Sequence, residues 1–480
     1  MKTIKEKFKE FRMRKGYLKF TADIGVILEK LFGRFWWYSL VHEKNTAISN
    51  TYHNLCLGVI IKEKYNFLDA FCDAFFKYCS FIVRYFIFFK FIKRVEEKEL
   101  FVTYYGMLSF LKTVDNKYLY IPQRKDWKKI RKEKGCYVFD NFLSFIDFIY
   151  AIFIYFKITF TFIFNRKHIK NLFDYHASLN FILFNMYNLC KKDLYRSFAG
   201  DVLIEGIFYD CIFNRLSKKI KNKGKLEKKI IYVFEGRSWE KALCYYFTKS
   251  GRFVEKIGVV CSAISDNNLQ FFYHSIDVGK MPLPEYIGVP GEILKEKLGK
   301  VYNDASVFIL GSNRVFHGNE INCEEIKIKK LLIILGSNDK QNIELLDFIK
   351  SHMSGNITVK KHPDSKLTNE EIGLKIETEI ILYDKKAVIA VSSTVTFDAI
   401  SYCIPIIVPK LKHYVDFIPI PDTYKGQKFC YRVDEGFDLM LAIDQIEETE
   451  LNFNICNEYI NKYFTYKSRE EMRQIIDSIC

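Results

Sequence analysis

Short apolar runs alternate with helix-length amphipathic segments along the second half of the chain. The runs before residue 312 are KKIIYVF (228–234), FVEKIGVVC (253–261) and SVFILG (306–311). Those after residue 330 are LLIILG (331–336), NITVKKHP (356–363), EIILY (379–383), AVIAVSS (387–393) and IPIIVPK (404–410). Near-continuous apolar strands that alternate with helices are typical of parallel sheets covered on both faces. The pattern therefore predicts an α/β fold with two Rossmann-like domains that face a cleft.

Changes in composition predict how these domains are bounded. A polar, charged stretch at 312–330 is typical of an interdomain linker, so we place the N-terminal domain at 1–315 and the C-terminal domain at 316–455. Residues of about 50–200 are aromatic-rich and helix-like, apart from an apparent strand at 99–105, and predict a helical insertion in the first domain. The segment 456–480 predicts a helix that crosses back onto that domain.

Two segments within the first 200 residues are very apolar, at 67–92 and 142–164. Each is interrupted by charged residues, so neither offers the roughly 18 uncharged residues that a bilayer crossing needs. Both predict long, partly buried helices. A second interpretation is that their aromatic faces, flanked by Lys and Arg, lie in a membrane interface.

The charge and the cysteine content indicate which partners and which kinds of site to expect. The 480 residues contain 73 Lys and Arg against 57 Asp and Glu, a formal charge of +16 that suits an anionic partner. An AT-rich genome would also explain the excess of Lys. Thirteen cysteines without a C-x-x-C pair indicate neither a metal site nor a disulfide framework. With an N-terminus that lacks the apolar core of a secretory signal, we expect a cytoplasmic location. No RNA- or DNA-reading motif is present, so we expect no nucleic-acid partner.

The candidate chemistry lies at strand ends in the second domain. His362 and Pro363 end the strand NITVKK, two residues after Lys360, while Ser392, Ser393 and Thr394 end another strand and begin a helix. Imidazole, hydroxyl and helix N–H groups together suit a phosphate. The alternative is an ordinary turn and a helix cap.

Other phosphate-binding motifs are absent. No G-x-G-x-x-G follows a strand and no G-x-x-x-x-G-K-[ST] occurs, which disfavours dinucleotide dehydrogenases and P-loop NTPases. Gly336 and Ser337 form a weaker strand-to-helix turn where the backbone could approach a ligand closely.

The segment with Lys360, His362 and Pro363, the Ser-Ser-Thr element and the strand IPII (404–407) resemble the donor half of GT-B transferases that use cytidine-nucleotide donors. These include sialyl- and Kdo-type transferases and CDP-glycerol polymerases. The resemblance implies that His362, Ser392 and Ser393 contact the donor phosphate. Cys403 departs from the pattern, because such proteins often have glycine there.

The front half is similar to a family of bacterial surface carbohydrate (O-antigen, capsule or lipopolysaccharide) biosynthesis proteins. The similarity rests on FWW (35–37), HEKN (42–45), YVFEGRSWEKAL (232–243) and KMPLPEYIGVPGE (280–292). Where related capsule enzymes would have histidine near 261, this chain has Cys261.

A carboxylate at the edge of the first sheet suits the base that inversion at an anomeric carbon needs. Glu235 ends the strand KKIIYVF and is our first candidate, and Glu43 is a lesser one; the alternative for Glu235 is a helix cap. Arg237 is expected to steady substrate charge, and Trp239 either stacks on a sugar or packs in the core.

Together these observations predict a GT-B glycosyltransferase that moves a sialic- or Kdo-like sugar from a CMP-activated donor to a glycan or lipid-linked acceptor. We expect no metal and no cofactor beyond this donor substrate, and peripheral contact with the inner membrane. The alternatives are a CDP-glycerol or CDP-alditol phosphotransferase and a non-catalytic polysaccharide-assembly protein.

Overall fold

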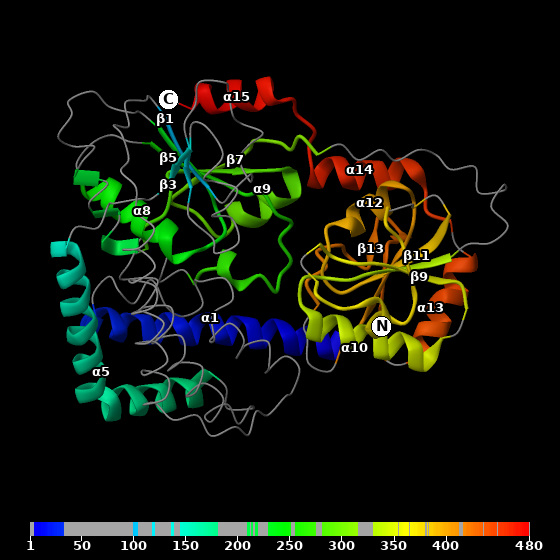
Figure 1. Cartoon of the computed structure of the whole chain (residues 1–480), viewed down its shortest axis with the longest axis horizontal. Helices are drawn as coiled ribbons and strands as arrows, with labels where there is room; N and C mark the ends of the chain where they lie inside the picture. The colour runs from blue at the N-terminus through cyan, green and yellow to red at the C-terminus, as the bar shows by residue number, and fades with distance from the viewer. Residues whose placement is uncertain are drawn as a thin grey trace.

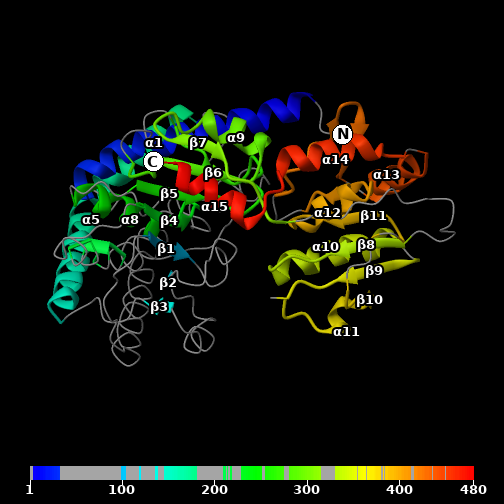
Figure 2. The same cartoon turned by 90° about the horizontal axis from the view of Figure 1, so that it is seen from above.

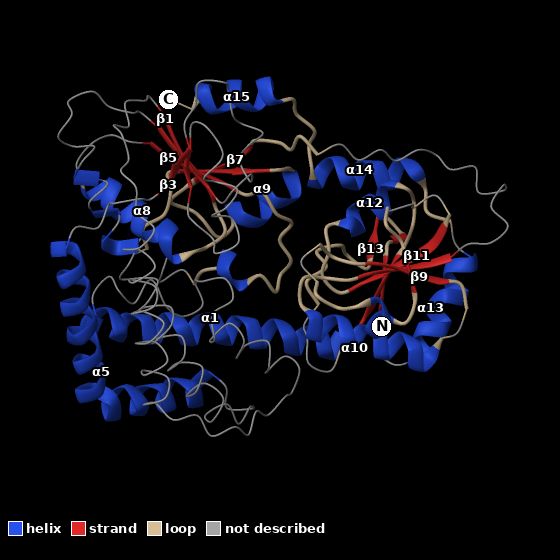
Figure 3. Ribbon diagram, in the orientation of Figure 1, coloured by secondary structure: helices blue, strands red, loops and turns tan. Residues whose placement is uncertain are grey.

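The computed structural model of the chain contains two parallel sheets. It describes residues 4–32, 99–103, 118–120, 136–138, 145–180 and 209–479, with gaps in the last range at 212, 215–216, 219–228, 251–254, 275–280, 315–329, 354, 364, 380–381, 383, 412–415, 435 and 449. The two sheets belong to two domains that lie side by side (Figure 1). Each is flanked by helices (Figure 3).

Within the described residues, the first sheet has seven strands, all paired in parallel. In spatial order they are β3 (Cys136–Val138), β2 (Tyr118–Tyr120), β1 (Glu99–Thr103), β4 (Lys229–Val233), β5 (Glu255–Val259), β6 (Tyr286–Val289) and β7 (Ser306–Ile309). Burial of every residue of β4 agrees with the near-continuous apolar run that predicted it.

In the described part of the second domain, the sheet has six strands, also all parallel. Their order is β10 (Lys375–Ile376), β9 (Ile357–Lys360), β8 (Lys330–Ile334), β11 (Lys385–Ala390), β12 (Ile406–Pro409) and β15 (Cys430–Val433). A short antiparallel hairpin, β13 (Thr423–Tyr424) and β14 (Gln427–Lys428), lies outside this sheet.

Helices cover both faces of each sheet because alternate strand residues point to opposite sides. In the first domain, α8 (Ser238–Lys249) and α9 (Glu292–Gly299) pack on one face and α15 (Arg469–Ser478) on the other. In the second, α10 (Asp339–His352) and α13 (Gly436–Glu448) cover one face, and α12 (Val395–Ser401) and α14 (Phe453–Tyr463) the other. Two short elements are α11 (Asn369–Ile372) and the 3-10 turn η5 (Leu269–Phe271).

The C-terminal helices connect the two domains. Helix α14 packs on α12 of the second domain and on α9 of the first. The chain then pairs with the end of β7, where the Ser312 N–H donates to the Thr465 carbonyl at 2.8 Å. Met472 and Ile476 of α15 finally join the apolar cluster of β4 and β5. This return of the chain completes a GT-B-like arrangement.

The carboxyl edges of the two sheets are turned toward each other. Loops that follow β5, β6 and β7 contact the second domain at residues near the ends of β11 and β12 and at α14. On the other side the sheets diverge, toward β3 in one domain and β10 in the other (Figure 2). The predicted fold class of two facing Rossmann-like domains is confirmed.

Two long helices lie beside the first sheet. Helix α1 (Ile4–Phe32) and helix α5 (Phe145–Asn180) pack against each other, and Tyr17, Phe20 and Ile158 join the core of the first domain. Helix α5 contains the predicted apolar segment 142–164 from residue 145 onward, whereas the segment 67–92 lies outside the described residues. None of the helices within the described ranges combines the length and apolar composition that a bilayer crossing requires.

Candidate functional site

Three neighbouring strands of the second sheet bring the predicted phosphate-binding residues to one edge. The sheet order places β8 between β9 and β11, so Gly336 after β8 lies between His362 after β9 and Ser392 after β11. The Leu335 N–H donates to the Lys360 carbonyl at 3.0 Å, which keeps the ends of β8 and β9 level. A Cβ added to Gly336 would lie 3.6 Å from the Ser392 carbonyl oxygen. The absence of a side chain at Gly336 therefore leaves space between the strand ends.

The turn after β8 is held by a side chain that the pattern did not predict. The fully buried Asn342 accepts a hydrogen bond from the Gly336 N–H at 2.8 Å and donates to the Gly336 carbonyl at 2.9 Å. The Asn338 side chain accepts from the N–H groups of Lys340 and Gln341 and caps α10. Ser337 is exposed between these two fixed points.

The loop that follows His362 is tied to the start of α10. The Ser365 hydroxyl donates to the Asp339 carboxylate at 2.6 Å, and the Lys366 N–H donates to the same group. The Ser365 N–H donates to the His362 carbonyl at 3.0 Å, which closes the turn containing the exposed Pro363. These bonds hold the half-buried His362 beside the β8 turn.

The Ser-Ser-Thr element begins α12 as predicted. Ser393, rather than the formal N-cap residue Thr394, supplies the capping oxygen, which accepts from the Val395 N–H at 3.2 Å. A serine hydroxyl that accepts one bond still has a proton to donate. Ser392 and Ser393 are half-buried and Thr394 is exposed.

Arg314 links this element to the first domain. It follows β7, and its Nη2 donates to the Asp398 carboxylate and, at 3.5 Å, to the Thr394 carbonyl. Burial raises the pKa of Asp398 above its ordinary value, although the neighbouring Arg314 acts in the opposite direction. Asp398 is thus a contact between the two domains.

Lys360 extends away from this group. Its ammonium donates to the Thr378 carbonyl, on the β10 side of β9, and so away from β8 and the Ser-Ser-Thr element. The structure therefore brings together Gly336, Ser337, His362 and the residues after β11, while Lys360 lies at the margin of the group.

Glu235 lies at the carboxyl edge of the first sheet, directly after β4. It is 5% exposed, and its Oε2 lies 3.5 Å from the Arg237 guanidinium. Cys261, after β5, is close enough that both burial and the Glu235 carboxylate raise its thiol pKa, to about 12. The thiol is therefore protonated at neutral pH and unsuited to act as a nucleophile.

Glu240 is the cap of this turn. Its two carboxylate oxygens accept from the N–H groups of Glu235 at 2.9 Å and Gly236 at 3.0 Å. It is 2% exposed, so the capping alternative fits Glu240 rather than Glu235. Trp239 is 1% exposed and packs edge-on against Tyr232 with ring centroids 5.8 Å apart, in agreement with the core-packing alternative.

Stability is expected to fall between about pH 5 and pH 8 because of Glu240. Burial raises its pKa from 4.5 to about 8, against the opposing effect of its backbone hydrogen bonds. A carboxyl whose pKa is higher in the folded state stabilises the fold while protonated, so this contribution is lost as the pH rises through about 8. Urea denaturation at several pH values should show the decline, and Glu240→Gln should flatten it. An equal decline in that variant would contradict the assignment, since contributions from all other titrating groups are the same in the two proteins.

Gly236→Ala is expected to destabilise the first domain by about 1–3 kcal/mol. Gly236 has φ of +75°, and a Cβ there would lie 2.8 Å from the Gln270 carbonyl oxygen, so both backbone strain and a backbone clash oppose the change. Thermal unfolding measures the loss. Gly299→Ala, where a Cβ meets nothing within 4 Å, is the matched control and should leave stability unchanged or slightly higher.

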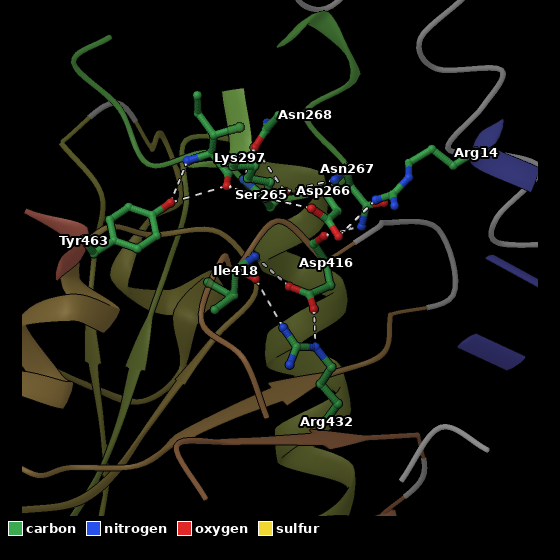
Figure 4. Close-up of polar contacts among 11 residues, drawn as sticks. Arg14, Ser265, Asp266, Asn267, Asn268, Lys297, Asp416, Ile418, Arg432 and Tyr463 are labelled. Carbon is green, nitrogen blue, oxygen red and sulfur yellow. Dashed lines mark hydrogen bonds and ion pairs between the residues drawn. The ribbon is translucent and has the colours of Figure 1, made fainter. Parts of the chain in front are cut away.

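A polar network at the domain contact was also not predicted (Figure 4). The Asn267 amide donates to the Asp416 carbonyl at 2.8 Å, and the Tyr463 hydroxyl bonds both to the N–H of Ile264, at 3.0 Å, and to its carbonyl, at 3.3 Å. Asp266 pairs with Arg14 of α1 at 3.0 Å and with Lys297 of α9 at 2.7 Å. The loop after β5 is thereby fixed to both domains.

Glu43 and the segments 35–37 and 42–45 lie outside the described residues. Asn342, Asp339 and Arg314 were missed because spacing along the chain does not distinguish buried polar residues from the many exposed ones nearby. Within the described ranges, no group of three His, Cys, Asp or Glu residues is arranged to hold a metal ion.

The sequence matches no protein-family model and no curated protein. Several solved structures align with most of the chain. CalG4, the calicheamicin glycosyltransferase, is 9% identical, with 80% of this chain and 98% of that chain covered and a TM-score of 0.43. Anabaena Alr3699/HepE in complex with UDP is 10% identical, with 80% and 99% covered and a TM-score of 0.41. The UDP-GlcNAc 2-epimerase of Methanocaldococcus jannaschii in complex with UDP-GlcNAc and UDP is 11% identical, with 79% and 98% covered and a TM-score of 0.38.

Proposed function

We propose that this protein is a glycosyltransferase that uses a nucleotide-activated sugar, with the donor phosphate bound at the ends of β8, β9 and β11. The observation that carries the proposal is that His362, Gly336 without a side chain, and Ser392 and Ser393 follow the ends of three neighbouring strands. Ligands of open parallel sheets bind at the carboxyl ends of the strands. This edge also faces the other domain, which supports an acceptor site opposite it.

The proposed chemistry needs only groups from the two facing edges. An acceptor hydroxyl attacks the anomeric carbon and gives its proton to a base, for which Glu235 is the candidate, while the bond from that carbon to the phosphate oxygen breaks. The electron pair stays on the leaving phosphate. Hydrogen bonds from His362 and the serine hydroxyls would stabilise this charge as it develops. The basic balance of +16 over the whole chain would favour approach of the anionic donor.

We propose a CMP-activated sugar of the sialic or Kdo type as donor and a surface glycan or its lipid-linked precursor as acceptor. The support is the K-x-H-P segment together with the Ser-Ser-Thr element: His362 and the Ser-Ser-Thr element follow strands that end at this sheet edge, and Lys360 lies at its margin. A CDP-alditol phosphotransferase would place its donor diphosphate on the same groups, so donor identity separates the two functions.

The test is nucleotide release from a panel of donors. The protein is incubated with CMP-sugars, UDP-sugars or CDP-glycerol, with and without a glycan acceptor, and released nucleotide is separated by chromatography. The proposal predicts CMP from a CMP-sugar and a loss of about 10²–10⁴-fold in Glu235→Gln with donor binding retained. Release of CMP from CDP-glycerol alone would establish the phosphotransferase. If the protein neither binds nor turns over any donor, the proposal is wrong and the non-catalytic assembly function is favoured.

A further inference from the structure

Helix α5 carries an exposed apolar stripe along its first half. Ile149, Phe153, Phe160, Ile163 and Phe164 are between 44% and 83% exposed. With about 3.6 residues per turn these positions fall on one side of the helix, over a length of roughly 22 Å. Phe156 lies on the same side and stacks on Phe160, which in turn stacks on Phe164, with centroids 6.3 and 6.5 Å apart.

The opposite side of the same helix is already occupied. Ile154 and Ile158 are buried in the core of the first domain together with residues of α1, and Ile152 packs against the same core. Among the described residues, the helix is therefore apolar on two sides, one of which is packed in the core while the other is exposed. A contiguous apolar surface of this kind marks an interaction site.

Charge lies along the stripe in a way that distinguishes between partners. Among the described exposed side chains of α5 the charged ones are both lysines, Lys157 within the stripe and Lys167 beyond its end, next to the exposed His168. Against a second copy of this chain, Lys157 would be enclosed among aromatic rings. At a lipid surface its long stem can lie along apolar neighbours while the ammonium reaches anionic headgroups.

The position of the helix also suits a flat surface. Helix α5 lies at the end of the first domain farthest from the second domain (Figures 1 and 2). The helix does not qualify as a membrane span, so it would lie in the plane of the interface.

We propose that the stripe formed by Ile149, Phe153, Phe160, Ile163 and Phe164 of α5, together with Lys157, docks the protein on an anionic lipid surface. Apolar side chains enter the headgroup boundary, and the lysine selects for negative charge. This proposal rests on α5 alone and does not depend on the proposed function, because α5 contributes no residue to the phosphate-binding edge.

The test is co-sedimentation of the full chain with vesicles of phosphatidylcholine, alone or mixed with phosphatidylglycerol. The wild-type protein should bind the mixed vesicles, and the triple change Phe153→Ser, Phe160→Ser and Phe164→Ser should weaken binding at least about tenfold. Phe437→Ser, at a 73% exposed residue of α13, is the matched control and should bind as the wild type does. Lys157→Glu should reduce the preference for phosphatidylglycerol.

Three results would overturn the proposal: no vesicle binding by the wild type, equal binding by the triple variant, or loss of binding in Phe437→Ser. A change from dimer to monomer in the triple variant by analytical ultracentrifugation, without vesicle binding by the wild type, would instead assign the stripe to self-association. If the triple variant does not fold, Phe160→Trp keeps the stripe apolar. Its emission should shift to the blue with mixed vesicles, whereas that of Phe437→Trp should not; equal spectra would reject the site. Nucleotide release in solution should be the same for all folded variants.

Discussion

His362→Ala is expected to weaken nucleotide binding by about 10–150-fold, the loss that follows when one charge-assisted hydrogen bond of about 1.5–3 kcal/mol is removed. His362 is half-buried at the end of β9, in a turn held by the backbone bond from Ser365 and by Asp339. Because the imidazole is only partly buried and the turn is held by these other bonds, the unfolding temperature should change little. Titration calorimetry with CMP and CDP measures the affinity.

His352→Ala is the matched control for this change. His352 is an exposed histidine of the same domain, at the far end of α10, where it lies against Phe348. Its removal should leave nucleotide affinity within about twofold, because it is remote from the strand ends. Equal nucleotide affinity of the wild type and His362→Ala would show that the imidazole does not contribute to the donor site.

Arg432→Ala is expected to destabilise the second domain by about 3 kcal/mol, because it leaves two partly buried carboxylates without their partner. The Arg432 side chain is 20% exposed and donates to Asp416 at 2.6 Å, to Asp422, and to the carbonyls of Ile418 and Ile420. It thereby holds the loop whose Asp416 carbonyl accepts from Asn267 of the first domain. Urea denaturation measures the loss.

Two further variants, a conservative change of Arg432 and the removal of a surface ion pair, are compared with Arg432→Ala. Arg432→Lys should recover less than half of the stability, because one ammonium cannot reach four acceptors in the plane of a guanidinium. Lys462→Ala removes an exposed ion pair with Glu458 and should leave stability nearly unchanged. A loss in Arg432→Ala no larger than in Lys462→Ala would show that the loop is held by other contacts.

Apolar runs predicted the long strands because their residues are buried on both faces. β4, β9 and β12 lie within such runs, while β8 begins one residue before its run and β11 two residues before its run. β6 was not predicted, since its YIGV segment is short and contains Gly288; the structure uses that glycine for close packing, with a Cβ there only 3.1 Å from Leu310. β15 was missed because Arg432 interrupts its apolar pattern, although the guanidinium is satisfied by the neighbouring loop.

Only those residues of the candidate site that follow the ends of strands could be predicted. His362, Gly336 and Ser392 each follow an apolar run, and parallel strands end at the same edge, so their proximity follows from topology. The burial of Glu240 and Asn342 could not be inferred, because both lie in polar stretches. Each lies in the first turn of a helix, and its side chain binds the backbone of the turn that precedes the helix. Likewise, nothing in the spacing of Arg314 and Asp398 indicates that they meet across the domains.

A crystal structure of the full chain soaked with CMP would test the proposed donor site most directly. The predicted result places the phosphate between the ends of β8 and β11, with its oxygens at hydrogen-bonding distance, about 3 Å, from the imidazole of His362 and from a hydroxyl of Ser392 or Ser393. A nucleotide bound at the first sheet alone, or held in the second domain away from His362 and both serines, would contradict the account.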